Sequence, residues 1–216
     1  MLPKTGLLVA VLVLACAACN EYVPRAEDDA GVPEIDAGFP LSKKANLKFK
    51  GNERIRNDFA RALGLDPKDV CKELGAFSCT HLVHQVALGG VEPYFLGLNE
   101  PLPFTTVTTP IATERVALAA CGNRVDRDLA DTDSALIYVG LDIDASGSLT
   151  NSNDPAMAAA VDTLYKRALQ REPTDNEVSE LTGFYAAVEA KSARPARDWA
   201  VLSCFAVMTT MEQLFY

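Results

Sequence analysis

Beyond residue 50, apolar positions along the chain repeat at three- and four-residue spacing, which is the period of amphipathic helices. Residues 52–63 carry one such stripe, and Gly64 follows at the position where helices commonly end. The same spacing predicts short helices over 66–75 and 79–90 and a further helix over 112–124. We therefore expect this half of the chain to be largely helical.

The segment 151–216 predicts three more helices. The first opens directly after Asp154, a residue type that caps helix N-termini. The second starts with the pattern of a capping box, in which Thr174 and Glu177 satisfy each other's backbone N–H groups. The third covers 196–214. Three amphipathic helices with short links can bury one another as a bundle.

Two segments depart from the helical pattern. Residues 91–110 combine prolines with a β-branched cluster and predict a long loop, and 135–143 predicts a short strand or buried extended segment. The sequence thus predicts a mainly α fold: a compact helical bundle with one long Pro-rich loop, at most one or two short strands and two disulfides. Four large apolar residues lie in the loop: Tyr94, Phe95, Leu96 and Phe104. We expect them to fold back over the core, whereas exposed they would mark an interaction site.

The first residues predict export. Lys4 precedes the apolar run GLLVAVLVLA, which has the length of a signal-peptide core and is too short to span a bilayer. The run ends in ACAAC, with small residues directly before Cys19. This stretch resembles the lipobox of bacterial lipoproteins, which implies that Cys19 receives diacylglycerol. Lipidation at Cys16 and ordinary cleavage at the A-x-A site formed by Ala15 and Ala17 are the alternatives.

The residue after the lipidated cysteine indicates which membrane would hold the anchor. Asn20 rather than Asp follows Cys19, and by the sorting rule of some gram-negative lipoproteins this implies the outer membrane rather than the inner membrane. Residues beyond the anchor are rich in Asp, Glu, Pro and Gly and cannot bury enough apolar surface to fold. The expected organisation is a lipoprotein signal peptide at 1–18, the lipidated cysteine and an acidic disordered tether at 19–45, and a single helical domain at 46–216, divided into N-terminal helices and loop at 46–150 and the three-helix module at 151–216.

The four other cysteines predict two disulfides. An exported chain is expected to oxidise its thiols, and Cys71, Cys79, Cys121 and Cys204 allow three connectivities. Cys71 and Cys79 flank a glycine-containing turn, so closing that loop needs little reorganisation. We predict the pairs Cys71–Cys79 and Cys121–Cys204, the second of which would join the C-terminal module to the earlier helices.

Part of the C-terminal segment resembles a helical module of exported bacterial proteins of uncharacterised function, with the pattern L-Y-x-R-x-L-x-R-x-P-T-x-x-E. The resemblance implies helical packing and no activity. The matching residues are Leu164, Tyr165, Arg167, Leu169, Arg171, Pro173, Thr174 and Glu177.

One loop has the spacing of a calcium site. Oxygen-bearing residues occupy alternate positions of an EF-hand-like loop around Gly147, which permits the tight turn, whereas Asn153 replaces the usual bidentate Glu at the end. The alternative is an Asx-rich turn that caps the next helix. The candidate ligands are Asp142, Asp144, Ser146, Ser148 and Thr150.

Two weaker patterns could also carry chemistry. His81 and His84 share a helical face and could bind a metal together with Cys79, although structural histidines are the simpler interpretation. A run of carboxylates could perform acid–base work, although a solvated helix end explains it as well. The run consists of Asp126, Asp128, Asp131 and Asp133.

Composition and the lack of known motifs argue against several classes of function. The 216 residues carry a formal net charge of -9 and no basic run, which argues against nucleic acid as a partner. No sequence motif singles out a nucleophile, a phosphate loop or a metalloprotease site. We expect a lipid-anchored envelope protein that binds or scaffolds a protein partner, as an accessory of adhesion, secretion or motility, with no required cofactor. The alternative is a small periplasmic metal-dependent enzyme or a calcium-binding module.

Overall fold

The computed structural model describes residues 47–102, 105–151 and 154–216. The described residues belong to one compact unit, Asn46–Tyr216, and are mainly helical, with one two-stranded sheet and two disulfides, which confirms the predicted fold class. The predicted signal peptide, Cys19 and the tether lie outside the described residues. None of the described helices is long and apolar enough to cross a membrane.

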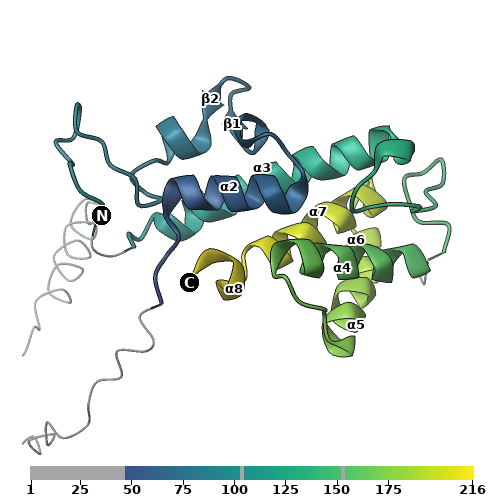
Figure 1. Ribbon diagram of the computed structural model, residues 1–216. Helices are drawn as coiled ribbons and strands as arrows, with labels where there is room; N and C mark the ends of the chain where they lie inside the picture. The colour runs from purple at the N-terminus through teal and green to yellow at the C-terminus, as the bar shows by residue number, and fades with distance from the viewer. Residues whose placement is uncertain (1–46, 103–104, 152–153) are drawn as a thin grey trace, which may run out of the picture. The chain divides into compact units, whose positions relative to one another are not determined.

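Figure 1 shows the elements in chain order, with α2 beside α3. The α-helices are α2 (Gly51–Leu63), α3 (Thr109–Ala130), α4 (Pro155–Ala168), α5 (Asp175–Gly183), α6 (Tyr185–Glu189), α7 (Pro195–Met208) and α8 (Met211–Leu214). The shorter elements are η1 (Pro67–Asp69), β1 (Lys72–Glu73), β2 (Phe77–Ser78), η2 (Cys79–Val83) and η3 (Thr132–Ser134).

Helix α2 forms where the apolar stripe predicted it. Ile55, Phe59 and Leu63 lie on one face and are fully buried against α3 and α4. The helix ends at Gly64, which adopts a left-handed conformation with φ of 59°. A Cβ atom there would also push the end of the Leu136 side chain aside, so the backbone angle is the main reason that the position favours glycine.

The core lies between α2, α3, α4 and α7, and α7 packs along α3. Trp199 of α7 is fully buried, and its indole Nε1 donates to the Leu181 carbonyl at 2.8 Å. Its ring meets Tyr138 edge to face, with centroids 6.3 Å apart. The predicted stripe of the last helix is wrong at Leu202 and Ala206, which are exposed because the opposite face, with Cys204, packs on α3.

Both disulfides pair as predicted. Cys71 and Cys79 are joined with their Cα atoms 5.5 Å apart, and Cys121 and Cys204 are joined at 5.7 Å. The second bond connects α3 to α7 across a sequence separation of 83 residues.

The helix predicted over 66–75 is wrong. Asp66 caps the short η1 turn by accepting from the Lys68 N–H, and the chain then forms the antiparallel hairpin β1–β2. Leu74 and Gly75 adopt positive φ angles of 51° and 74°, which turn the hairpin and stop a helix. The Cys71–Cys79 bond closes the hairpin at its base.

Three further boundaries differ from prediction. The helix expected over 79–90 is limited to η2, with turns after it. The helix expected from Thr174 breaks near Gly183 into α5 and α6, because glycine weakens a helix interior. The last helix breaks after Met208, where the Thr210 hydroxyl accepts the Gln213 N–H and starts α8.

Candidate functional site

The Pro-rich loop carries an ordered turn at its tip. The Glu92 carboxylate accepts the backbone N–H groups of Tyr94 and Phe95 at 3.0 and 3.1 Å. The Leu98 N–H donates to the Glu92 carbonyl at 3.0 Å and closes the turn. Gly97 supplies the positive φ of 65° that the chain reversal needs. The tip, residues 92–98, is therefore held in one shape by its own hydrogen bonds.

This tip presents apolar side chains to solvent. Tyr94 and Phe95 are each 91% exposed and Leu96 is 61% exposed. The prediction that these side chains fold back over the core is wrong. Glu92 accepts the backbone N–H groups of Tyr94 and Phe95 and holds the chain in a turn that leaves their side chains exposed to solvent. Phe104 lies outside the described residues. A cluster of exposed aromatic side chains on a fixed turn is typical of an interaction site.

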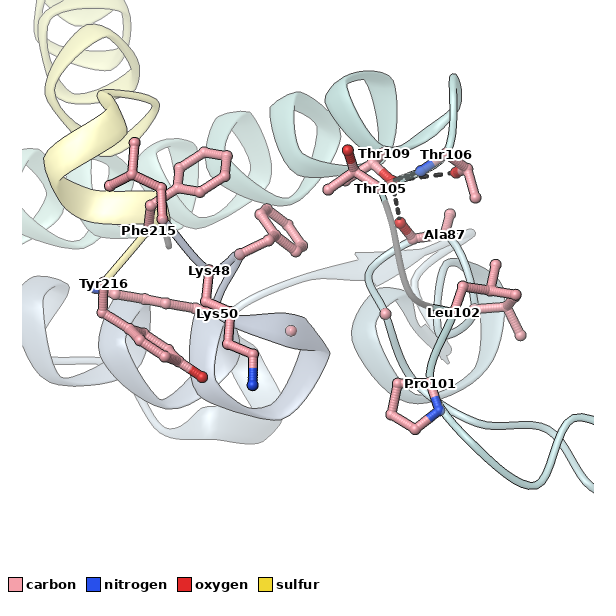
Figure 2. Close-up of a pocket in the computed structure, with 15 residues that line it drawn as sticks. Lys48, Lys50, Ala87, Pro101, Leu102, Thr105, Thr106, Thr109, Phe215 and Tyr216 are labelled. Atoms are coloured by element: carbon pink, nitrogen blue, oxygen red, sulfur yellow. Dashed lines mark hydrogen bonds between the residues drawn. The ribbon is translucent and has the colours of Figure 1, made fainter. Parts of the chain in front are cut away.

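A second feature is a hollow of about 450 Å³ where the two ends of the described chain meet, which we call the terminal groove. The Lys48 N–H donates to the Tyr216 carbonyl at 2.9 Å, and the Tyr216 N–H donates back to Lys48 at 3.1 Å. Phe49 and Phe215 stack edge to face at 5.7 Å beside this pair. Figure 2 shows Lys50 and Tyr216 on one side of the groove and Pro101 on the other.

Threonine hydroxyls fix the far wall of the terminal groove. Thr109 Oγ1 donates to the Ala87 carbonyl at 2.6 Å and accepts the Thr106 N–H at 2.9 Å (Figure 2). These bonds join the start of α3 to Ala87, which precedes the Pro-rich loop, and to Thr106 near its end. Sequence patterns did not reveal the groove, because it forms only when segments from opposite ends of the described chain come together.

Two lysine side chains are the charged side chains among the described residues that line the groove. Lys48 is exposed, and Lys50 reaches the buried carboxylate of Asp58 at 3.1 Å. Arg54 and Arg61 approach the same carboxylate at 3.1 and 3.6 Å, but they line a neighbouring hollow and not the groove. The described residues that line the groove include no Asp or Glu side chain. A groove that combines apolar side chains with lysines is suited to bind an apolar peptide segment that also carries carboxylates, because opposite charges attract.

The two histidines do not converge. His81 is exposed, whereas His84 Nε2 lies 2.7 Å from the Glu73 carboxylate, which Arg115 also contacts at 3.0 Å. The hydrogen bond from His84 is the main cause that lowers the pKa of Glu73. Cys79 is held in a disulfide and has no thiolate to offer. Within the described parts of the chain, no group of three His, Cys, Asp or Glu side chains converges.

The candidate calcium loop folds as a self-bonded turn. One oxygen of Asp144 accepts from the backbone N–H groups of Ser146 and Ser148 at 2.8 and 3.1 Å and from the Ser146 hydroxyl at 2.6 Å. The Ser146 hydroxyl is the main cause that lowers the pKa of Asp144. The Thr150 N–H donates to the Asp142 carbonyl at 2.9 Å. Asn153 lies outside the described residues, and calcium binding stays a prediction.

The acidic run separates into different environments. Asp128 is fully buried and pairs with Arg124 at 2.6 Å, whereas Asp126 is exposed and pairs with Arg197 at 2.7 Å. Asp131 binds the Ser134 hydroxyl at 2.7 Å, and Asp133 is exposed. The run therefore brings no two carboxylates together for acid–base work. The four-residue spacing from Arg124 to Asp128 is the sequence signal that could have identified the buried pair.

Of the two alternatives predicted for 135–143, the strand does not form, whereas Ile137 and Tyr138 are buried, and Asp128 explains why. Its two carboxylate oxygens accept the backbone N–H groups of Leu136, Ile137 and Tyr138 at 2.8, 3.1 and 3.1 Å. A strand would need these groups for a neighbouring strand, so the segment instead wraps around the end of α3.

The residues of the C-terminal pattern hold helices together. Arg167 donates to the carbonyls of Ala62 and Arg61 at 2.6 and 3.1 Å and so caps the end of α2. Arg171 makes a bidentate ion pair with Glu177, at 2.7 Å and 2.9 Å. The guanidinium also lies 5.0 Å from the Tyr165 ring centroid. These contacts assign packing and capping roles to this part of the pattern.

The pair made by Arg171 predicts an acid-sensitive contribution to stability. The Arg171 hydrogen bonds, with those from Thr174, lower the pKa of Glu177 from 4.5 to about 2. Because the native state holds the ionised carboxylate, its contribution is full above 4.5 and is lost as the pH falls towards about 2. Glu177→Gln, which keeps the capping box, should therefore show a shallower fall in the free energy of unfolding over this range. Urea titrations from pH 5 downwards measure it; a slope equal to that of the wild type would contradict the assignment, and Glu180→Gln is the control.

Comparison with protein-family models, with curated proteins and with solved structures finds no match to this chain.

Proposed function

We propose that this chain is a lipid-anchored cell-envelope protein that acts by binding a protein partner rather than by catalysis. The observation that carries the binding role is the tip of residues 92–98, where Tyr94 and Phe95 are each 91% exposed on a turn fixed by Glu92. Aromatic side chains are enriched at the centres of protein interfaces because each buries a large area at low entropic cost.

The order of the tip strengthens the argument. A disordered apolar segment loses conformational entropy when it binds, which weakens its affinity. This turn is already closed by three hydrogen bonds and would lose less. Most of the binding energy of an interface comes from a few such anchors. A role as an accessory of adhesion, secretion or motility fits this design.

The anchor itself is supported by the lipobox-like stretch before Cys19. A single lipid-modified cysteine followed by a long tether lets a domain reach partners at the membrane without spanning it. The outer membrane is the proposed location, because Asn20 follows the cysteine.

Lipidation is tested with two cysteine variants. Cys19→Ala should lose labelling with a radioactive fatty acid and leave the membrane fraction, because the acceptor is gone. Cys16→Ala is the matched control and should still be lipidated. If Cys16→Ala alone abolishes the label, the anchor is at Cys16 and the assignment is wrong.

A further inference from the structure

We propose that the tip of one copy of this chain docks into the terminal groove of a second copy, so that the protein is a two-fold dimer with reciprocal contacts. The inference rests on the proposed function and names the partner as a second copy.

The two surfaces are both apolar. The tip offers two aromatic rings that are each 91% exposed and a leucine that is 61% exposed. The terminal groove offers a hollow of about 450 Å³ whose lining includes Phe49, Phe215 and Leu102. Neither Tyr94 nor Phe95 is among the described residues that line the groove of its own molecule.

The two surfaces are also complementary in charge. The loop 91–102 carries Glu92 and Glu100 and no Lys or Arg. The described residues that line the groove include no acidic side chain and two lysines, of which Lys50 pairs with Asp58 and Lys48 is exposed. Neither Glu100 nor Lys48 has an ion pair with another described residue. Opposite charges of this kind fix the orientation of a docked segment. The acidic loop argues against an anionic lipid surface as the occupant, since like charges repel.

The geometry favours a reciprocal arrangement. Pro101 and Leu102, at the end of the loop, line the groove, so tip and groove are neighbours on one molecule. A two-fold axis can then place both tips in both grooves at once. Each aromatic ring buries about 150–250 Å². The four rings of a reciprocal dimer, together with the surface that they cover, therefore reach the roughly 1,200 Å² of a stable interface, whereas one tip in one groove would bury only half of that area.

The test is the mass of the full chain in a density-matched non-ionic detergent, measured by sedimentation equilibrium. We expect the mass of two chains for the wild type and of one chain for Phe95→Ser. Because Phe95 is 91% exposed, the variant should keep the wild-type circular dichroism spectrum. Val139→Ser, which removes a half-exposed apolar side chain elsewhere, is the matched control and should keep the dimer.

Charge reversal tests the groove. Lys48→Glu and Glu100→Lys should each weaken the dimer by about tenfold or more, because like charges then face each other, and the double variant should restore it. Glu180→Lys, an equal change of charge on α5, should have no effect.

A single-chain mass for the wild type, or a double variant no better than either single one, overturns the second-copy proposal. A photo-crosslink from position 95 to a different protein would also overturn it while supporting the proposed function. No crosslink at all would overturn both.

Discussion

Replacing Asp128 with alanine should lower the free energy of unfolding by about 3–5 kcal/mol, the cost of removing one partner from a buried ion pair. The change leaves the buried Arg124 guanidinium without its carboxylate, which lies at 2.6 Å in the wild type. It also removes the acceptor of the three backbone N–H groups from Leu136 to Tyr138. Buried donors without a partner carry their full desolvation penalty. Urea denaturation followed by circular dichroism measures the loss.

Asp126 provides the matched control. It lies on the same helix two residues earlier, and its ion pair with Arg197 is partly exposed, in contrast to the buried pair of Asp128. Asp126→Ala should cost about 0–1 kcal/mol, as exposed pairs usually do. Asp128→Asn keeps one carbonyl acceptor and should fall between the two. Equal losses for Asp128→Ala and Asp126→Ala would show that the buried carboxylate does not hold this end of α3.

Removing the disulfide between α3 and α7 should have the other large effect. The double variant Cys121→Ala/Cys204→Ala opens a loop spanning a sequence separation of 83 residues. In the chain-entropy account, the loss is about 4.5 kcal/mol, because the unfolded chain regains the freedom that the cross-link had removed. Calorimetry of the oxidised wild type and the double variant measures it.

The short disulfide supplies the comparison. Cys71 and Cys79 are separated by only 8 residues, and the same account gives about 2.5 kcal/mol for Cys71→Ala/Cys79→Ala. We expect this smaller loss to be accompanied by local opening of the β1–β2 hairpin. A larger loss for the short bond than for the long one would contradict the view that the long bond joins the two parts of the domain.

Sequence patterns predicted the features that depend on local chemistry. The apolar stripe and Gly64 gave the bounds of α2 within a residue, and the cap at Asp154 and the box of Thr174 and Glu177 form as expected. The disulfide pairing followed from chain proximity and was confirmed.

Features that depend on distant contacts were missed. The segment 135–143 has the composition of a strand, but its N–H groups bind a carboxylate that lies on α3, and no local pattern records that contact. The terminal groove needs Phe49 beside Phe215, at opposite ends of the described chain. The exposure of Phe95 was also missed. An apolar residue is expected to be buried, and the hydrogen bond to Glu92 that holds Phe95 in an exposed turn is visible only in the structure.

The most direct measurement of the central claim, that this protein binds through its tip, is site-specific photo-crosslinking in intact cells. A benzoylphenylalanine placed at position 95 of the full chain should give one defined adduct on irradiation, because the ring would lie inside the bound partner. The same residue at position 139, which is half-exposed but lies away from the tip, is the control and should give none. Equal, diffuse or absent crosslinking at both positions would contradict a binding role for the tip.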